Sequence, residues 1–280
     1  MRVDLHIHST FSDGLFTPTE LVAAAVKAKL AAISLTDHDS LDGFHEAACA
    51  GKENGVEVVP GVELSSQYQG RDLHILGYGV DPDDDAFQEM LRRFRERRHK
   101  RGLKIIEKLN VLGITIEPAE VLAKSGKGAL GRPHVAAVLL EKGVVSRTGE
   151  AFDKYIAEGG PAYVPKYKMT AGEAIEHIHG AGGLAFVAHP GVFLEHMDEL
   201  QALIDQGFDG VEVYHPTHSQ TRSEELKKVA TRNGLLISGG TDFHGFSGRD
   251  VPMGGVKVPY ELWEKMKARI QEHHKRGKDS

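Results

Sequence analysis

The chain begins with a stretch in which apolar and polar positions alternate. Val3, Leu5 and Ile7 are separated by Asp4 and His6, and a second histidine follows at position 8. Successive side chains of a strand point to opposite faces, so the aspartate and both histidines share one face. Two imidazoles placed in this way can bind one metal ion. The alternative is an edge strand whose polar side faces water, and this stretch alone does not decide between them.

A regular alternation of strands and helices follows. Thr17, Pro18 and Glu20 have the spacing of a capping box with proline in the first turn, which predicts a helix to about Lys29. Strands that alternate with helices indicate a parallel sheet covered by helices. The expected strands are residues 3–7, 31–35, 56–64, 72–80, 183–190, 210–216 and 235–244.

Between the two halves of this alternation, only helical patterns occur. They cover residues 84–112, 117–125, 131–143 and 148–158, and a segment rich in glycine and proline follows at 159–167. We therefore expect a barrel domain formed by residues 1–81 and 161–280, with residues 82–160 as an inserted helical cap subdomain. About seven strands with one insertion favour a closed α/β barrel over an open sheet.

Composition narrows the class of protein. The chain has 280 residues, of which 40% are hydrophobic, and a net charge of −6, which argues against a general affinity for nucleic acid or anionic lipid. Its one cysteine, Cys49, argues against a disulfide framework or a thiolate zinc site. We see no signal peptide and no stretch long enough to span a membrane, so we expect a cytoplasmic protein without a membrane partner. Nothing in the sequence indicates an obligate protein partner.

Histidines and acidic residues gather at the ends of the predicted strands. In a βα-barrel, side chains at the carboxyl ends of the strands converge on one mouth. Each residue alone could be a turn residue or a solvated strand end, but the whole set predicts a site of imidazoles and carboxylates, which suits divalent first-row metals. The set is His6, His8, Asp37, His38, Glu63, His74, His189, His215, Asp242 and His244.

Six motifs, in order, resemble the PHP family, named for polymerase and histidinol phosphatase: HIHSTFSDG, TDHDS, PGVELS, LHILGY, AHPG and GGTDFH. The resemblance implies a distorted (βα)7 barrel with a trinuclear metal site. It also implies that a metal-bound hydroxide is the nucleophile, with no side chain assigned as catalytic. We expect two or three divalent ions among manganese, iron and zinc, with manganese favoured. The implied ligands are His6, His8, Asp13, His38, Glu63, His74, His189, Asp242 and His244.

The inserted helices resemble those of the PHP phosphoesterases that act on nucleoside 3′,5′-bisphosphates. The GRPH motif places Arg132 and His134 at a helix start, where a guanidinium and backbone N–H groups can bind phosphate. The basic run from 92 to 104 adds Arg98, Lys100 and Arg101, although such a run is more often a solvated helix face. The expected substrate contacts are these five residues together with Asp13 and His38.

We therefore predict a phosphoric monoester hydrolase that removes the 3′-phosphate from a nucleoside 3′,5′-bisphosphate such as pAp. Short 5′-phosphorylated RNA is a second candidate substrate. The competing enzyme hypotheses are a histidinol-phosphate phosphatase, which the basic insertion argues against, and an amidohydrolase-type barrel, which fits the FSDG and TDHD segments less well. A non-catalytic metal-binding module is the alternative of another class, and the complete ligand set argues against it.

Overall fold

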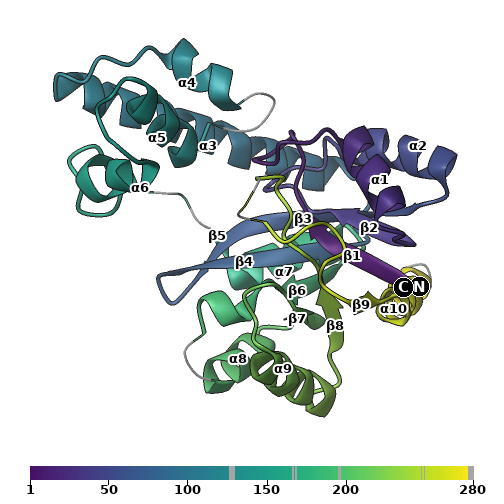
Figure 1. Cartoon of the computed structure of the whole chain (residues 1–280). Coiled ribbons are helices and arrows are strands. Elements are labelled where there is room, and N and C mark those ends of the chain that lie inside the picture. The colour runs from purple at the N-terminus through teal and green to yellow at the C-terminus, as the bar shows by residue number, and fades with distance from the viewer. Residues whose placement is uncertain are drawn as a thin grey trace. The chain divides into compact units, whose positions relative to one another are not determined.

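The chain forms two compact units in the computed structural model. The first consists of residues 1–89 and 168–280, and the second of residues 90–167. The structure describes residues 1–125, 130–165, 167, 169–194, 197–246, 248 and 250–276. Figure 1 shows the elements of both units, with the second unit in teal.

The first unit is a nearly closed α/β barrel. Its strands follow the order β8-β7-β6-β4-β3-β2-β1-β9, and β5 pairs with β3 outside this path. Residues just after β8 complete the barrel, because Phe243 bridges to Ile7 in parallel and its carbonyl accepts a 2.9 Å hydrogen bond from His8 N. The predicted α/β barrel is therefore confirmed. The strands are β1 (Arg2–Ile7), β2 (Ala32–Leu35), β3 (Glu57–Tyr68), β4 (Arg71–Tyr78), β5 (Met169–Thr170), β6 (Leu184–Val187), β7 (Gly210–Tyr214), β8 (Leu236–Gly239) and β9 (Val258–Pro259).

Helices cover the outside of this sheet (Figure 1). Helix α7 packs on β3, β4 and β6, whereas α9 packs on β7 and β8. The predicted capping box at the start of α1 is present, with Glu20 N donating to Thr17 Oγ1 and Thr17 N donating to Glu20 Oε2. The helices of this unit are α1 (Pro18–Lys27), α2 (Phe44–Asn54), α7 (Ala171–Gly180), α8 (Met197–Ile204), α9 (Gln220–Arg232) and α10 (Tyr260–Arg276), with a 3₁₀ turn at Pro190–Val192.

The first strand is buried on both faces, so the edge-strand alternative is wrong. Val3, Leu5 and Ile7 pack among apolar core residues, and His6 and His8 are fully buried on the opposite side. Burial of two imidazoles requires polar partners for their ring nitrogens. The barrel interior must therefore supply them.

Two predictions about the sheet need correction. Strand β4 is antiparallel to both of its neighbours, β3 and β6, whereas we expected a parallel strand. In addition, β5 and β9 have two residues each, too few to show a periodic pattern, and were not predicted. The direction of β4 matters for the site. Because β4 runs opposite to β3 and β6, its amino-terminal half lies at the same edge of the sheet as their carboxyl ends.

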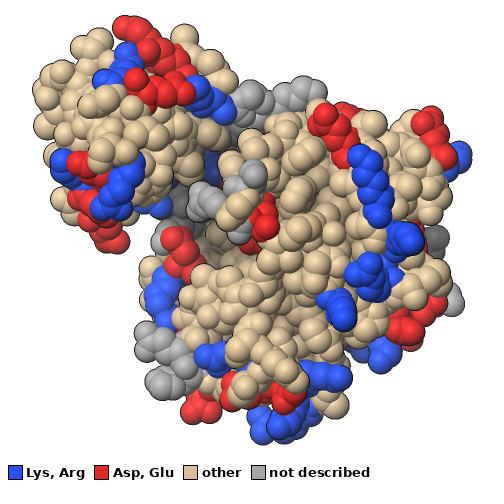
Figure 2. Space-filling view, viewed as in Figure 1, with Lys and Arg blue, Asp and Glu red and all other residues tan. Residues whose placement is uncertain are grey.

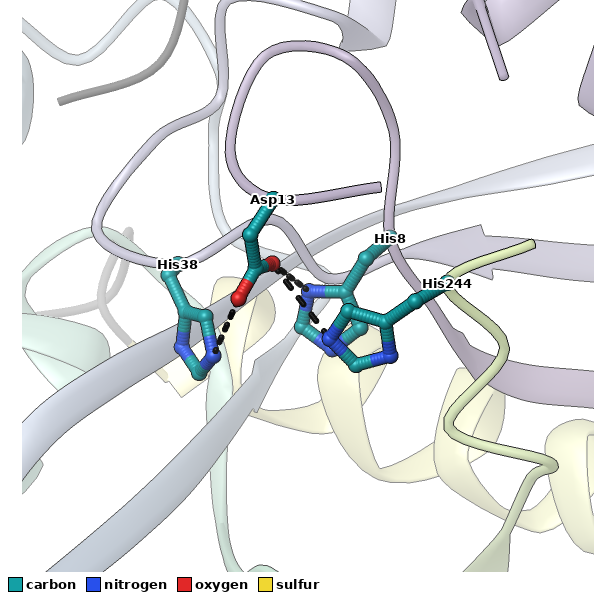
Figure 3. Close-up of side chains that lie close together, drawn as sticks. All are labelled: His8, Asp13, His38 and His244. Atoms are coloured by element: carbon teal, nitrogen blue, oxygen red, sulfur yellow. Dashed lines mark ion pairs between the residues drawn. The ribbon is translucent and has the colours of Figure 1, made fainter. Parts of the chain in front are cut away.

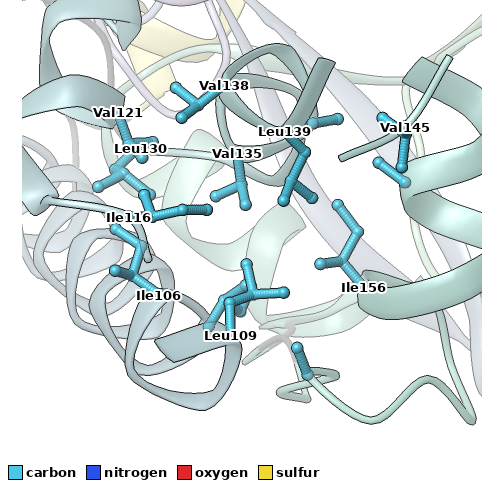
Figure 4. Packing of buried hydrophobic residues seen from close by; sticks show 14 residues of the cluster. Ile106, Leu109, Ile116, Val121, Leu130, Val135, Val138, Leu139, Val145 and Ile156 are labelled. Carbon is cyan, nitrogen blue, oxygen red and sulfur yellow. The ribbon is translucent and has the colours of Figure 1, made fainter. Parts of the chain in front are cut away.

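The second unit is helical and has its own core. Long helix α3 (Asp85–Val111) begins in the first unit and continues into the second. Figure 4 shows apolar side chains from several helices packed together, including Leu109, Leu139 and Ile156, all of which are fully buried. The segment predicted as one helix at 148–158 is a short α-helix followed by a π-helix. The other helical segments are α4 (Pro118–Ser125), α5 (Arg132–Glu141), α6 (Thr148–Ala151) and the π-helix Phe152–Ile156.

The surface carries no extended field of one charge on the face shown in Figure 2, where basic and acidic side chains are interspersed. Across the described part of the chain, every helix is too short or too polar to cross a membrane.

Candidate metal centre

The carboxylate of Glu63, on β3, lies at the centre of the histidine cluster. Its Oε1 atom is 2.8 Å from His74 Nδ1 and 3.0 Å from His189 Nε2. The other oxygen, Oε2, is 3.2 Å from ring nitrogens of both His8 and His38 and 3.4 Å from His6 Nε2. Glu63 is 1% exposed, so its charge is shielded from water. A buried carboxylate with each oxygen directed at a different set of imidazoles has the form of a bridging ligand.

Asp242, which follows β8, lies against two of the same histidines. Its Oδ1 atom is 3.2 Å from His6 Nε2 and 3.1 Å from His8 Nε2. These two histidines therefore face two carboxylates, from Glu63 and Asp242, at once. The four residues provide donor atoms within 4.8 Å of one another.

A second group of donors surrounds Asp13, in the loop after β1 (Figure 3). His244 Nε2 is 3.3 Å from Asp13 Oδ1, and His38 Nε2 is 3.7 Å from Asp13 Oδ2. His8 Nδ1 lies 3.7 Å from Oδ1. The side chain of Asp13 is 37% exposed, which makes this group the more accessible of the two.

The buried ring nitrogens test whether these residues suit a metal ion. Both nitrogens of His8, Nδ1 of His38 and Nδ1 of His189 are buried, and none has a hydrogen-bond partner among the described residues. Several of them lie close to carboxylate oxygens, yet without the alignment of a hydrogen bond. Nitrogen and oxygen atoms that converge without pairing fit ligation of a shared cation. The donor set therefore fits divalent metal ions.

The electrostatics of the cluster also favour a cation. Burial opposes the charged form of His8, but the negative charges of Asp242 and Glu63, 3.1 and 3.2 Å from its Nε2 atom, outweigh it and raise the pKa of His8 to about 10. Burial likewise opposes ionisation of Glu63, yet the surrounding histidines, His38 first, hold its pKa well below the usual range. The carboxylates thus stabilise positive charge at the centre of the cluster, which a bound metal ion would supply.

Two members of the cluster have unusual backbone conformations. His189 has φ 26° and Asp242 has φ 52°, both in the left-handed region that non-glycine residues seldom adopt. Next to Asp242, Gly240 allows a close approach of two strands, because a Cβ atom there would lie 2.4 Å from His6 N. Strained residues of this kind persist where surrounding contacts hold them, and they concentrate at functional sites.

Other acidic residues of the motifs support the site without joining it. Asp4 shares a strand face with His6, but its carboxylate accepts hydrogen bonds from Thr241 and Gly254 and so ties β1 to the segment after β8. Asp37 is buried and accepts hydrogen bonds from Ser9 and Ser12, which fixes the loop before Asp13. The TDHDS motif therefore contributes His38 to the cluster and Asp37 to its support.

The structure brings all nine expected ligands together in the first unit. Their role as ligands is a prediction that the geometry leaves untested. His74 joins them because β4 is antiparallel, so that its amino-terminal half reaches the mouth of the barrel. Sequence reasoning did not single out Glu212, and it placed His215 among the residues at the strand ends but not among the nine implied ligands; both are buried and, with His6, form a further group of close donor atoms. A glutamate between two valines in GVEVY and a histidine directly after that strand were the available signals.

The expected cationic contacts lie in the second unit and are not all alike. Lys100 is exposed on α3, and Arg98 and Arg132 are partly exposed. Arg101 Nε donates a 2.8 Å hydrogen bond to Val164 O. His134 Nδ1 accepts a 3.0 Å hydrogen bond from Gly131 N at the start of α5. These contacts give Arg101 and His134 a part in local structure, and the Nδ1 atom of His134 accepts, so its ring is neutral; substrate binding by the five residues stays a prediction.

Comparison with known proteins agrees with this site. A family model for the PHP domain matches residues 4–132. A 3′,5′-nucleoside bisphosphate phosphatase of Chromobacterium violaceum is 34% identical, over 96% of this chain and 98% of its own length. A 5′-3′ exoribonuclease of Haemophilus influenzae is 36% identical, over 87% of this chain and 90% of its own.

The fold comparison gives the same result. A crystal structure from Bifidobacterium adolescentis, assigned to the metal-dependent phosphoesterases, superposes with a TM-score of 0.84 at 30% identity and covers 95% of this chain and 96% of its own. Similarity over nearly the full length, in both sequence and fold, accompanies a barrel mouth built from histidines and carboxylates. The chain therefore belongs to the PHP family of metal-dependent phosphoesterases.

Proposed function

We propose that this protein hydrolyses the 3′-phosphate of nucleoside 3′,5′-bisphosphates, converting pAp to 5′-AMP and orthophosphate. The observation that carries the proposal is the convergence of His6, His8, Glu63 and Asp242 with the Asp13 group in a chain that matches a bisphosphate phosphatase of Chromobacterium violaceum over almost its whole length. The reaction would take place in the cytoplasm, the compartment that we expect from the sequence.

The donors around Glu63 and Asp13 would hold two or three metal ions. We assign one ion to His6, His8, Glu63 and Asp242, and a second to Glu63 with its Oε1 neighbours His74 and His189. A third would be held by Asp13, His38 and His244. Nitrogen and oxygen donors without thiolates are compatible with manganese, iron or zinc, and we favour manganese. The ions supply Lewis acidity to the attacking water and to the phosphoryl oxygens when they are bound.

The protein positions the side chains of the cluster and leaves some of them accessible to a substrate. Asp13, His74 and Asp242 are the most exposed members of the cluster, with side-chain exposures of 37%, 29% and 29%, so the phosphoryl group would approach on their side. Asp13 and His38 are our candidates for direct contact with it. No side chain is assigned as the acid that protonates the leaving group.

A bisphosphate needs a second anion site, for which we propose the cations of the helical unit. Arg132, at the start of α5, is the first candidate because a guanidinium can bind phosphate through two parallel hydrogen bonds, and the positive end of a helix dipole favours an anion there. Arg98, Lys100, Arg101 and His134 are the further candidates. Binding energy from a 5′-phosphate held away from the reaction would orient the 3′-phosphate and so raise the rate.

A second candidate activity is removal of nucleotides from the 5′ end of short 5′-phosphorylated RNA. The relative from Haemophilus influenzae named as a 5′-3′ exoribonuclease supports it. Such a substrate also carries a 5′-phosphate near the bond that is cleaved.

A panel of substrates at matched concentration tests the proposal, with Mn²⁺ supplied. We expect kcat/KM to be highest for pAp and much lower for 3′-AMP and 5′-AMP, which each lack one phosphate. A higher value for histidinol phosphate, or equal values for pAp and 3′-AMP, would contradict the proposed substrate. Release of mononucleotides from a 5′-phosphorylated pentaribonucleotide would support the second activity.

A further inference from the structure

Strand β7 contributes none of the nine expected ligands, yet it contacts several of them. Glu212, at its centre, is fully buried, and its Oε1 atom lies 2.9 Å from His6 Nδ1. A carboxylate can only accept here, so the ring proton of His6 resides on Nδ1. In the neutral ring Nε2 then has the lone pair, 3.4 Å from Glu63 Oε2 and 3.2 Å from Asp242 Oδ1, so that a cation shared with these oxygens could be ligated by Nε2.

Glu212 also holds a second member of the cluster. Its Oε2 atom accepts a 2.7 Å hydrogen bond from the backbone N–H of His189. Two residues further on, Gly191 N donates a 2.9 Å hydrogen bond to Nε2 of His218, which lies in the turn after β7. These two bonds hold the backbone at His189 and just after it, where the φ of 26° at His189 is otherwise unfavourable.

His215, the first histidine after β7, has the opposite proton arrangement to His6. Thr217 N donates to His215 Nδ1 at 3.2 Å, and Thr217 Oγ1 lies 2.8 Å from the same atom. A backbone N–H can only donate, so Nδ1 carries the lone pair and the proton of the neutral ring is on Nε2. That atom is buried, makes no hydrogen bond among the described residues, and lies 3.4 Å from Asp242 Oδ2.

The two oxygens of Asp242 therefore have different surroundings. Oδ1 faces His6 and His8, whereas Oδ2 faces the N–H of His215. An N–H directed at Oδ2 from 3.4 Å would favour one rotation of the carboxylate and leave Oδ1 for a metal ion. Ligation through His215 Nε2 would require the other tautomer, in which Nδ1 could donate to Thr217 Oγ1 but could no longer accept from Thr217 N.

We propose that β7 and the turn after it form a positioning layer for the metal centre. Glu212 sets the tautomer of His6 and holds the backbone of His189, His215 sets the carboxylate of Asp242, and His218 secures the turn after His189. None of these three residues is a metal ligand. The inference rests on the proposed metal chemistry of the site and is tested by metal binding, without any substrate.

The first experiment is a Mn²⁺ titration of the metal-free Glu212→Gln protein, followed by the electron paramagnetic resonance signal of free Mn²⁺. The amide can accept from His6 or from His189 N but not from both, so we expect a roughly 10- to 100-fold loss of Mn²⁺ affinity, as for other partners of metal ligands. Glu57→Gln is the matched control, because Glu57 is a strand carboxylate that accepts from Tyr260, Trp263 and Lys267 and lies outside every group of close donors. Wild-type Mn²⁺ affinity in folded Glu212→Gln, or an equal loss in Glu57→Gln, would overturn the role of Glu212.

The second experiment separates the N–H donor of His215 from the volume of its ring. His215→Phe keeps a ring and removes the donor, whereas His215→Gln supplies an amide N–H at a similar reach. We expect His215→Phe to weaken Mn²⁺ binding about tenfold or more, with the number of bound ions unchanged, and His215→Gln to restore most of the loss. Wild-type affinity in His215→Phe would overturn the role, as would loss of one Mn²⁺ equivalent in both variants, which would make His215 a ligand. If pAp were not a substrate, the proposed function would fail while these titrations would still decide the positioning layer.

Discussion

Replacing Glu63 by glutamine is the most informative single change at the metal centre. The side chain keeps its size, but one oxygen becomes an NH₂ group and the charge is lost. In the structure, Oε1 and Oε2 face different histidines, with His74 and His189 on one side and His6, His8 and His38 on the other. The substitution therefore affects two groups of donors at once.

The expected loss of metal affinity follows from this division of the two Glu63 oxygens between two sets of histidines. Loss of one supporting contact to a metal site costs roughly 10- to 100-fold in affinity, and loss of a bridging ligand should cost at least that at each of two ions. The two factors multiply to about 10²- to 10⁴-fold, or about 3 to 6 kcal/mol of metal-binding free energy. Turnover should fall with metal occupancy, since under the proposed function bound ions would supply the Lewis acidity that the hydrolysis needs.

The assay combines metal content by mass spectrometry with phosphate release from pAp and from a generic phosphate monoester. Glu57→Gln serves again as the control for loss of a hydrogen-bonded strand carboxylate, here a partly buried one. We expect Glu63→Gln to be purified with at least one equivalent of metal fewer and with little activity on either ester. Full activity at a reduced metal content would refute the assignment of Glu63 as a bridging ligand.

Three further predictions concern other parts of the molecule. Arg132→Ala should raise KM for pAp with metal content unchanged, because loss of a charged phosphate contact costs about 1.5–3 kcal/mol, a tenfold or larger change in kcat/KM. Gly240→Ala should destabilise the protein by about 1–3 kcal/mol in urea unfolding and reduce metal content, because the new methyl would lie 2.4 Å from His6 N. The hydrogen bond from His179 to Asp209, 2.7 Å long, raises the pKa of His179 in the folded protein. The difference in unfolding free energy between wild type and His179→Asn should therefore be fully present below the unfolded-state pKa of about 6.5. It should shrink as the pH rises through the pKa of His179 in the folded protein.

Each of these predictions has a matched control. Arg147→Ala removes an exposed arginine from the same helical unit and should leave KM unchanged, so an equal rise in KM would contradict the role of Arg132. Gly172→Ala places a methyl group where no atom lies within 4 Å and should be neutral, so equal stability of Gly240→Ala would contradict the close-approach reasoning. His177→Asn changes an exposed residue on the same helix as His179. The same dependence on pH in this variant would remove Asp209 as the cause.

Much of the site could be predicted because its residues lie at ends of strands that have clear patterns. The alternation in β1 placed His6 and His8 on one face, and the barrel brings the ends of distant strands to that face. Asp4 shows the limit of this reasoning, since it has the same alternation but binds Thr241 and Gly254. Periodicity gives the face of a residue, whereas its partner depends on the register of strands far apart in the sequence.

The direction of β4 was predicted wrongly although the sequence holds a signal for it. Only Gln69 and Gly70 separate β3 from β4, and both have positive φ, 48° and 80°. A two-residue connection of this kind joins antiparallel strands, because a parallel pair needs a long crossover. The antiparallel direction is what brings His74 to Glu63, so the turn is also a determinant of the site.

The positioning residues were harder to predict for a different reason. Glu212 lies between valines in an apolar strand, and nothing local distinguishes a ligand from a residue that holds a ligand. Its two partners, His6 and His189, come from separate strands. Only the structure shows that each of its carboxylate oxygens already pairs with a member of the cluster, Oε1 with His6 Nδ1 and Oε2 with His189 N.

The products of pAp hydrolysis by the manganese-loaded protein test the central claim most directly. Phosphorus NMR of a single reaction distinguishes 5′-AMP from 3′-AMP and measures orthophosphate at the same time. We predict 5′-AMP and orthophosphate in equal amounts, with no product when the metal is removed by a chelator and activity restored by Mn²⁺. Formation of 3′-AMP, or orthophosphate release that persists without metal, would contradict the account.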